Sequence, residues 1–361
     1  FRVAEAAVRQ APEDAAWHKR LAQVAEWERK PDVALREWRW LARRDGGEEA
    51  LLALLRLAPG LGDYDTLLEA WKRIAAVRKL DEAQWRALAD LFEQAGRQRE
   101  GIEFFEARHA GEGDPLPLEI AARLAQRSGD DERAQRLYLR LLDRHGFSAD
   151  RLLKIVTLHL QKGRNQEAFD LLQKYRGQAG EKEADYWKLL ADLAWQLQRD
   201  ETAAEAYRRL AAGGNLSRDD YSRLLFLLGE SQQEEAAALA ELAYRKFGDG
   251  EMLLRALEIH AARNDLLAQK RLFEHIAAER EADFSGTARF YLMRAQYHRA
   301  VGALPPARAD FRRAASIAPG DASTVSAMLW FLIDTHDHPA LREVMAQVIA
   351  RGDQQNPVYW G

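Results

Sequence analysis

The chain has 361 residues, of which 47% are apolar and 30% are charged, and 57 acidic against 53 basic side chains give a net charge of −4. This balance excludes the strongly basic surface typical of nucleic-acid-binding proteins. Because the chain has no cysteine, disulfides, zinc–cysteine sites and thiol catalysis are excluded as well. A chain of this length usually forms two domains, unless it is built from repeats that pack only on their neighbours.

A mostly small residue recurs about every 34 positions along the whole chain. The positions are Ala34, Leu67, Gly101, Ala134, Ala168, Ala203, Ala237, Ala268, Ala307 and Ala340. A period of this length is typical of repeated helix pairs. It predicts an all-α solenoid, a superhelical array of antiparallel helix pairs that offers an extended surface rather than one deep pocket.

The period also divides the chain into segments. Residues 1–12 begin inside a helical pattern without Met, and we expect them to be the second helix of a preceding repeat in a longer protein. For residues 13–278, the period predicts an array of about eight repeats. A longer step between small residues predicts an insertion or longer loop at 279–287, and residues 288–361 predict two further repeats.

The third repeat shows the pattern within one unit. Trp85, Leu88 and Phe92 are spaced to lie on one face of a first helix. Gly96 marks a turn, and Gly101 lies near the start of a second helix, where a small side chain lets two backbones approach closely. Equivalent turns are predicted at Gly62, Gly129 and Gly163.

This pattern resembles the tetratricopeptide repeat, whose marks are Trp-x2-Leu-Gly-x2-Tyr, then Ala-x3-Phe-x2-Ala, then Pro. The resemblance covers essentially the whole chain, although the Gly of the first helix is mostly Ala, Val or Leu here and the closing Pro is usually missing. It implies a binding scaffold that is not an enzyme and holds no cofactor.

The resemblance also implies that the first helices line a concave groove. Three positions in each first helix, set by their distance from the Trp position, point into it. They carry Arg86, Asp90 and Glu93 in the third repeat, Glu119, Arg123 and Gln126 in the fourth, Leu153, Thr157 and Leu160 in the fifth, and Lys188, Asp192 and Trp195 in the sixth. This mixture of charge suits a protein or a polar polymer better than a nucleic acid. The alternative is a solvated surface without a ligand.

Other candidate sites have structural explanations. His336 and His338, with Asp334 and Asp337, form the densest group of metal-ligand types, but the segment also fits a polar loop between two helices. We predict no metal or catalytic site, and keep an enzyme that uses these histidines as an alternative. Paired carboxylates such as Asp219 and Asp220 are expected at helix starts.

The aromatic and histidine side chains divide into two groups. Structural positions, in the core or one residue away from it, are predicted for Trp17, Trp38, Trp71, Trp85 and Trp187, and packed, hydrogen-bonded histidines for His159 and His298. Partly exposed positions, with roles in binding sugars or a partner protein, are predicted for Trp27, Trp40 and Trp195.

Residues 34–41 and 163–172 are similar to the helical scaffold of the outer-membrane export proteins for the biofilm exopolysaccharide Pel. The resemblance implies a periplasmic scaffold, anchored through an outer-membrane β-barrel outside this piece, that docks the deacetylase and hydrolase PelA and guides the polymer. It implies no nucleic acid as a partner. Direct binding of the polysaccharide, or a scaffold for a different protein, are the alternatives.

Overall fold

The structure is a computed structural model that describes residues 1–352 and residue 356. In this part of the chain the secondary structure is entirely helical, with 22 α-helices and two short 3-10 helices. The fold divides into two compact units, residues 1–180 and 181–361. No described helix is both long enough and apolar enough to cross a membrane. The expected all-α class is therefore confirmed, and the two units are described separately.

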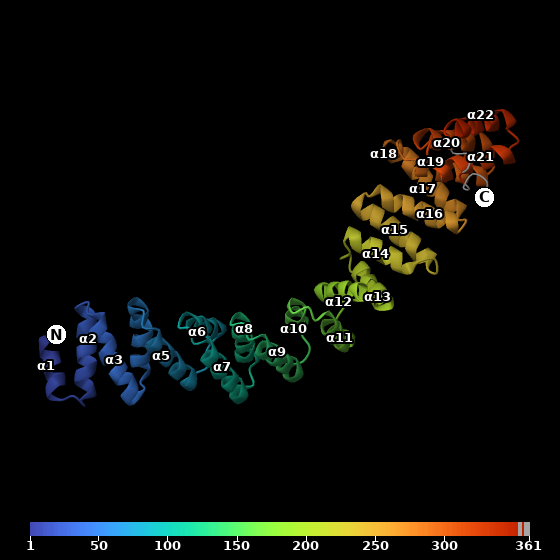
Figure 1. The fold of residues 1–361 in the computed structure, drawn as a ribbon. Helices are drawn as coiled ribbons and strands as arrows, with labels where there is room; N and C mark the ends of the chain where they lie inside the picture. The colour runs from blue at the N-terminus through green and yellow to red at the C-terminus, as the bar shows by residue number, and fades with distance from the viewer. Residues whose placement is uncertain (353–355, 357–361) are drawn as a thin grey trace. The chain divides into compact units, whose positions relative to one another are not determined.

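The first unit consists of a single helix followed by five helix pairs (Figure 1). Its elements are α1 (Arg2–Gln10), α2 (Ala15–Trp27), α3 (Pro31–Asp45), α4 (Glu48–Leu57), η1 (Ala58–Leu61), α5 (Tyr64–Val77), α6 (Glu82–Gln94), α7 (Gln98–Glu112), α8 (Pro115–Arg127), α9 (Asp131–His145), α10 (Ala149–Gln161), α11 (Asn165–Tyr175) and η2 (Arg176–Gln178). Each even-numbered helix is the first of a pair, and each pair packs on the next along the chain.

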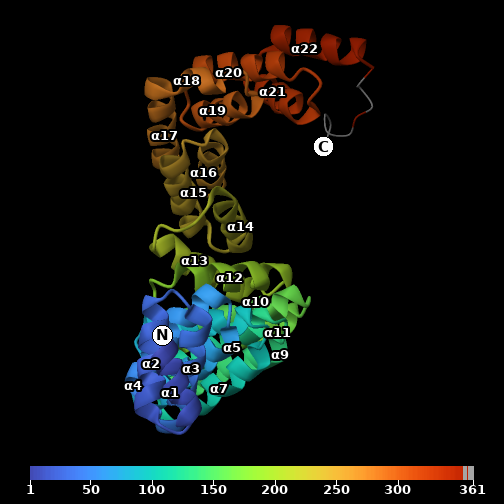
Figure 2. The same ribbon diagram turned by 90° about the vertical axis from the view of Figure 1, so that its left-hand side faces the viewer.

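The second unit continues the pattern with five more pairs (Figure 2). Its elements are α12 (Ala184–Gln196), α13 (Asp200–Ala212), α14 (Arg218–Leu228), α15 (Gln233–Phe247), α16 (Gly250–Ala262), α17 (Leu266–Glu279), α18 (Glu281–Phe284), α19 (Ala288–Ala300), α20 (Leu304–Ile317), α21 (Ala322–Asp334) and α22 (His338–Ala350). The extra residues predicted at 279–287 contain α18, whose Phe284 is buried against Phe290 with ring centroids 5.2 Å apart.

The small residues of the repeat lie where paired helices cross. Ala134, Ala168 and Ala203 have no exposed surface. At Gly101, a Cβ atom would come within 2.7 Å of the Phe92 ring, so the close approach of α7 to α6 requires glycine. These positions confirm that the small side chains set the distance between the helices of a pair.

The eighth pair departs from the predicted spacing by one residue. Ala268 is only half-buried, and Gln269 takes the buried position on α17 with 5% exposure. Its side-chain amide donates to the carbonyl oxygens of His260 and Asp265 at 3.4 and 3.3 Å. A polar residue is tolerated there because the carbonyls of the preceding turn satisfy its donors.

Turns within the pairs use the left-handed backbone region. Gly62, Gly96, Gly129 and Gly163 have φ between 66° and 79°, as expected for the predicted turns. Four other pairs place a non-glycine residue at the same point, with φ between 54° and 56°: Arg29, Gln198, Asn264 and His336. These residues carry the steric cost that glycine avoids.

We predict that Gln198→Gly stabilises the second unit by about 0.5–1 kcal/mol, because the relief of left-handed strain outweighs the added freedom of the unfolded chain. Gln196→Gly, two positions earlier at the end of α12, is the control and should be destabilising. Thermal unfolding followed by circular dichroism measures both variants. A lower melting temperature for Gln198→Gly would contradict the assigned turn.

A second recurring contact links successive second helices. An arginine or lysine donates to a backbone carbonyl oxygen at the end of the preceding second helix or just beyond it, 31 to 33 residues earlier. The pairs are Arg73 with Ala42, Arg108 with Ala75, Lys246 with Gly214, Arg280 with Gly248 and Arg351 with Pro319. Helix C-termini leave carbonyls unsatisfied and carry partial negative charge, so each cation ties one repeat to the next.

Candidate functional site

The predicted groove residues lie on the first helices of their pairs. We call the exposed side of these helices (α2, α4, α6, α8 and α10 in the first unit, and α12, α14, α16, α19 and α21 in the second) the first-helix face. Ion pairs along it join neighbouring repeats. Each pair links a carboxylate to a basic side chain on an adjacent first helix, 30 to 34 residues away in the sequence.

In the first unit, these ion pairs involve three of the predicted acidic residues. Glu93 accepts a hydrogen bond from Arg127 at 2.8 Å, and Asp90 lies 3.9 Å from the same guanidinium. Glu119 accepts from Arg151 Nε at 2.8 Å. Sequence reasoning missed both arginines, although their spacing of one repeat from an acidic residue was a usable signal.

The remaining predicted residues of the first unit are not drawn together. Arg86 pairs with Glu82 on its own helix, and Arg123 is exposed on α8. The fifth repeat presents the predicted apolar interval, with Leu153 and Leu160 half-buried. The first-helix face of this unit is therefore mostly a network of paired charges, with Arg123 open to solvent.

In the second unit, the predicted residues meet partners from the next repeat. Lys188 Nζ donates to Asp192 Oδ1 at 3.0 Å and to Asp220 Oδ1 at 2.7 Å. Arg223 Nη1 donates to Asp192 Oδ1 at 2.9 Å. We call Lys188, Asp192, Trp195, Asp220 and Arg223 the Lys188 cluster. Its residues come from α12 and α14, so stacking of the sixth and seventh pairs assembles it.

Asp220 is the buried anchor of this cluster, with 2% of its side chain exposed. Ser217 begins α14 in a capping box with Asp220, and its hydroxyl donates to Asp220 Oδ2 at 2.7 Å. Burial alone would raise the pKa of Asp220, but hydrogen bonds from Lys188 and Ser217 outweigh it and hold the pKa below its ordinary value of 3.8. The carboxylate therefore stays charged inside the protein.

Tyr207 on α13 forms hydrogen bonds with two side chains of the cluster. Its hydroxyl donates to Asp192 Oδ1 at 3.3 Å and accepts from Arg223 at 3.1 Å. Burial raises the pKa of this hydroxyl, so it stays protonated and able to donate. Each polar side chain of the cluster is thus held in one orientation by at least one other.

An aromatic edge borders the cluster. Trp195 packs against Phe226 of α14 in a T-shaped contact with ring centroids 5.7 Å apart, and the Arg223 guanidinium lies 5.8 Å from the Trp195 ring. Phe226 is 73% exposed. Together with Gln196, Ser217 and Asp219, the Lys188 cluster lines a cavity of about 240 Å³. Paired charges beside exposed aromatic rings suit binding of a polar ligand or partner.

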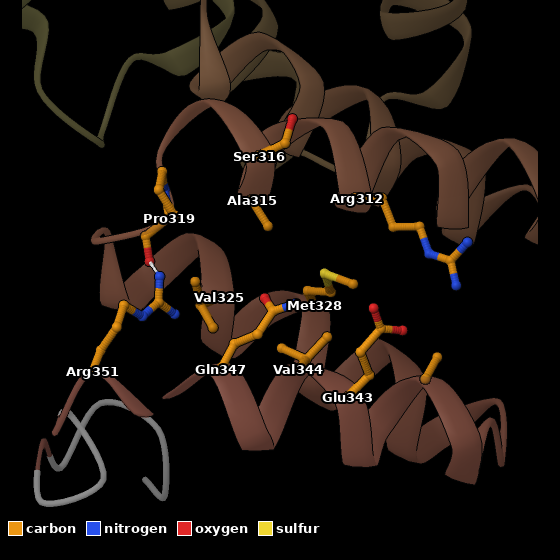
Figure 3. Close-up of a pocket in the computed structure, with 11 residues that line it drawn as sticks. Arg312, Ala315, Ser316, Pro319, Val325, Met328, Glu343, Val344, Gln347 and Arg351 are labelled. Atoms are coloured by element: carbon orange, nitrogen blue, oxygen red, sulfur yellow. Dashed lines mark hydrogen bonds between the residues drawn. The ribbon is translucent and has the colours of Figure 1, made fainter. Parts of the chain in front are cut away.

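Another cavity, of about 420 Å³, lies between α20, α21 and α22 (Figure 3). Val325, Met328 and Val344 contribute apolar side chains to its lining, while Arg312 and Glu343 point toward one another on one side of them. A similar hollow lies between α3 and α5 in the first unit. Both follow the groove between successive second helices, which is a regular feature of the stacked pairs.

The other sequence predictions have mixed outcomes. Trp38, Trp85 and Trp187 are buried, whereas Trp17 is 38% exposed and Trp71 only half-buried, so these two do not lie in the core itself. Trp17 lies one position before the inward residue of α2, which is the buried His18. Among the predicted exposed residues, Trp27 is 79% exposed, whereas Trp40 is half-buried and stacks on His18.

The structure also shows the surroundings of the histidines considered in the sequence. His159 is buried beside Gln135, and His298 bonds to Asp310 at 3.0 Å, so both are packed and hydrogen-bonded as predicted. His336 lies in the turn between α21 and α22, its ring 6.3 Å from that of His338. Within the described ranges, no three histidine, aspartate or glutamate side chains gather as a metal site.

The acidic residues near His336 have structural partners. Asp337 caps α22 and pairs with Arg308 at 3.1 Å, while Asp334 pairs with Arg299. The paired carboxylates lie in first helical turns, as predicted. For Asp220 this explanation was incomplete, because the residue also anchors the Lys188 cluster.

The profile of the tetratricopeptide repeat family matches residues 140–360, more than half of the chain. No curated protein sequence matches this chain. Among solved structures, the chain is similar to one in the structure of Naa15/Naa10 bound to HypK-THB, with 14% identity and a TM-score of 0.45. The alignment covers 96% of this chain and 64% of that chain, so this chain spans less than two thirds of its length.

Two bacterial structures are also similar. A tetratricopeptide repeat protein from Parabacteroides merdae is 16% identical with a TM-score of 0.33, and the alignment covers 79% of this chain and 98% of that one. MamA from Desulfovibrio magneticus is 16% identical with a TM-score of 0.32, covering 46% of this chain and 96% of that one.

Proposed function

The chain belongs to the tetratricopeptide repeat family, and we propose that this protein-interaction scaffold serves in the periplasm in secretion of the exopolysaccharide Pel. In this role it docks the deacetylase and hydrolase PelA and guides the polymer toward an outer-membrane pore. The chain itself contributes binding surface and no chemistry.

The specific assignment rests on the likeness of residues 34–41 and 163–172 to the helical scaffold of PelB, the Pel export protein. The structural observation that supports a docking role is the first-helix face. Its charges are largely paired within the stack, so they are held in place before a partner arrives. A surface ordered in advance loses less conformational entropy on binding.

Arg123 offers the clearest test of docking on this face. It is exposed on α8, the helix that also carries Arg127 and Glu119, whose charges are paired with those of Glu93 and Arg151. We predict that Arg123→Glu weakens the binding of purified PelA about tenfold, mostly through slower association. Biolayer interferometry of the whole chain measures the rate constants.

Arg136→Glu is the matched control, because Arg136 is equally exposed on the second helix α9 of the same pair and the change in net charge is identical. Its affinity for PelA should equal that of the parent chain. Equal weakening by both variants would indicate a general charge effect, and weakening by Arg136→Glu alone would place docking on the second helices.

A further inference from the structure

The aromatic edge of the Lys188 cluster, formed by Trp195 and Phe226, is only partly used in packing α12 against α14. Phe226 leaves 73% of its surface in water, although α14 already buries Tyr221, Leu224 and Leu225 toward the core. The planes of the Phe226 and Trp195 rings meet at 79°. A large aromatic side chain fixed beside a polar cavity is a typical feature of sites that bind amphipathic ligands.

The cavity has the size and the chemistry of a site for one sugar unit. Its volume of about 240 Å³ is below the range for drug-sized ligands. Sugars present an apolar face of C–H groups, which packs on aromatic rings, and an edge of hydroxyl groups, which hydrogen-bond to charged and amide side chains. Trp195 in the cavity lining supplies the first surface, and Phe226 extends it just outside the lining, because its ring contacts that of Trp195. Asp192, Gln196 and Arg223 supply the second.

The charge balance indicates which sugar. Three carboxylates (Asp192, Asp219 and Asp220) line the cavity against two cations (Lys188 and Arg223). Both cations are engaged by Asp192 and Asp220, while Asp219 is exposed at the rim in the first turn of α14. The surplus negative charge favours a ligand with a protonated amine over a uronic acid.

We infer that this cavity binds one hexosamine unit of an amine-bearing polysaccharide, with Trp195 against the ring face, the adjoining Phe226 at the edge of the sugar and Asp219 near the amine. The inference rests on the proposed function, in which a polymer passes along this scaffold. It adds the location of the contact, the class of sugar and three residues of the seventh repeat: Asp219, Arg223 and Phe226.

Calorimetric titration of the whole chain with three oligosaccharides tests the site. The probes are hexamers of glucosamine, of N-acetylglucosamine and of galacturonic acid. We expect the affinity to fall in that order, and the glucosamine affinity to decrease with added salt. Absence of binding by all three, or strongest binding of the galacturonate hexamer, would overturn the inference.

Variants then locate the binding. Phe226→Ala and Trp195→Ala should weaken glucosamine hexamer binding at least tenfold, and Asp219→Asn should remove the preference for the glucosamine hexamer over the N-acetylated hexamer. Phe226 and Asp219 are exposed, so their replacement should leave folding intact. Trp27→Ala, an equally exposed aromatic in the first unit, is the control, and equal losses for it and Phe226→Ala would overturn the assigned site.

The failure of this site and the failure of the docking proposal give different results. PelA binding without hexamer binding would contradict the proposed sugar site and support the docking proposal. Hexamer binding that depends on Phe226, without PelA binding, would support the sugar site and contradict the docking proposal.

Discussion

Replacing Asp220 with alanine is expected to destabilise the second unit by about 3 kcal/mol. This value is at the low end for breaking a buried ion pair, because Lys188 keeps Asp192 as a partner and 41% of its side chain is in contact with water. The substitution also removes the capping box at Ser217. Urea unfolding of the whole chain, followed by circular dichroism and by hydrogen exchange in α12 and α14, measures the effect.

The pH dependence of this effect has a definite sign. The pKa of Asp220 is lower in the folded than in the unfolded chain, so the carboxylate stabilises the fold fully above its ordinary value of 3.8. That contribution is lost as the pH falls through the folded pKa. The difference between the parent chain and Asp220→Asn should therefore be largest near neutral pH and should shrink below pH 3.8.

Asp219→Ala provides the control for Asp220→Ala. Asp219 is the neighbouring carboxylate in the same first turn and is exposed, so its removal should cost about 0.5 kcal/mol or less. Equal losses of stability for the two variants would mean that each carboxylate acts only through its interaction with the helix dipole. The buried pair with Lys188 would then not contribute to stability.

The second large effect is expected at a helix crossing. Ala203→Trp should destabilise the sixth pair by about 1–3 kcal/mol or more, because Ala203 has no exposed surface and an indole there forces α12 and α13 apart. Ala212→Trp, at the exposed end of the same helix, should leave stability close to that of the parent chain. Chemical unfolding compares the two, and equal stability of both variants would show that the repeat register is wrong.

The architecture could be predicted because each repeat places the same physical requirement on the sequence. A small residue is needed wherever two helices cross, and this requirement makes the period visible at Ala134, Ala168 and Ala203. The prediction was wrong by one residue at Ala268 because the hydrogen bonds of Gln269 allow a polar side chain in the buried position. Composition and spacing do not show whether a buried polar side chain will find hydrogen-bond partners.

The candidate site could be predicted only in part. Lys188, Asp192 and Trp195 were found because they occupy fixed positions on one first helix. Asp220, Arg223 and Phe226 were missed because they approach from the next helix, and a single-helix pattern contains no information on which charges pair across repeats. The spacing of 31 and 32 residues between the paired charges was a signal that a comparison of consecutive repeats could have used.

The proposed function of the chain is to hold a protein that modifies an exported polymer. Quantitative binding of the purified whole chain to PelA and, in parallel, to the purified Pel polymer tests it most directly. We predict submicromolar binding of PelA together with weaker, salt-sensitive binding of the polymer. Polymer binding without PelA binding would move the function to direct polysaccharide recognition, and binding of neither would contradict the assignment to Pel secretion.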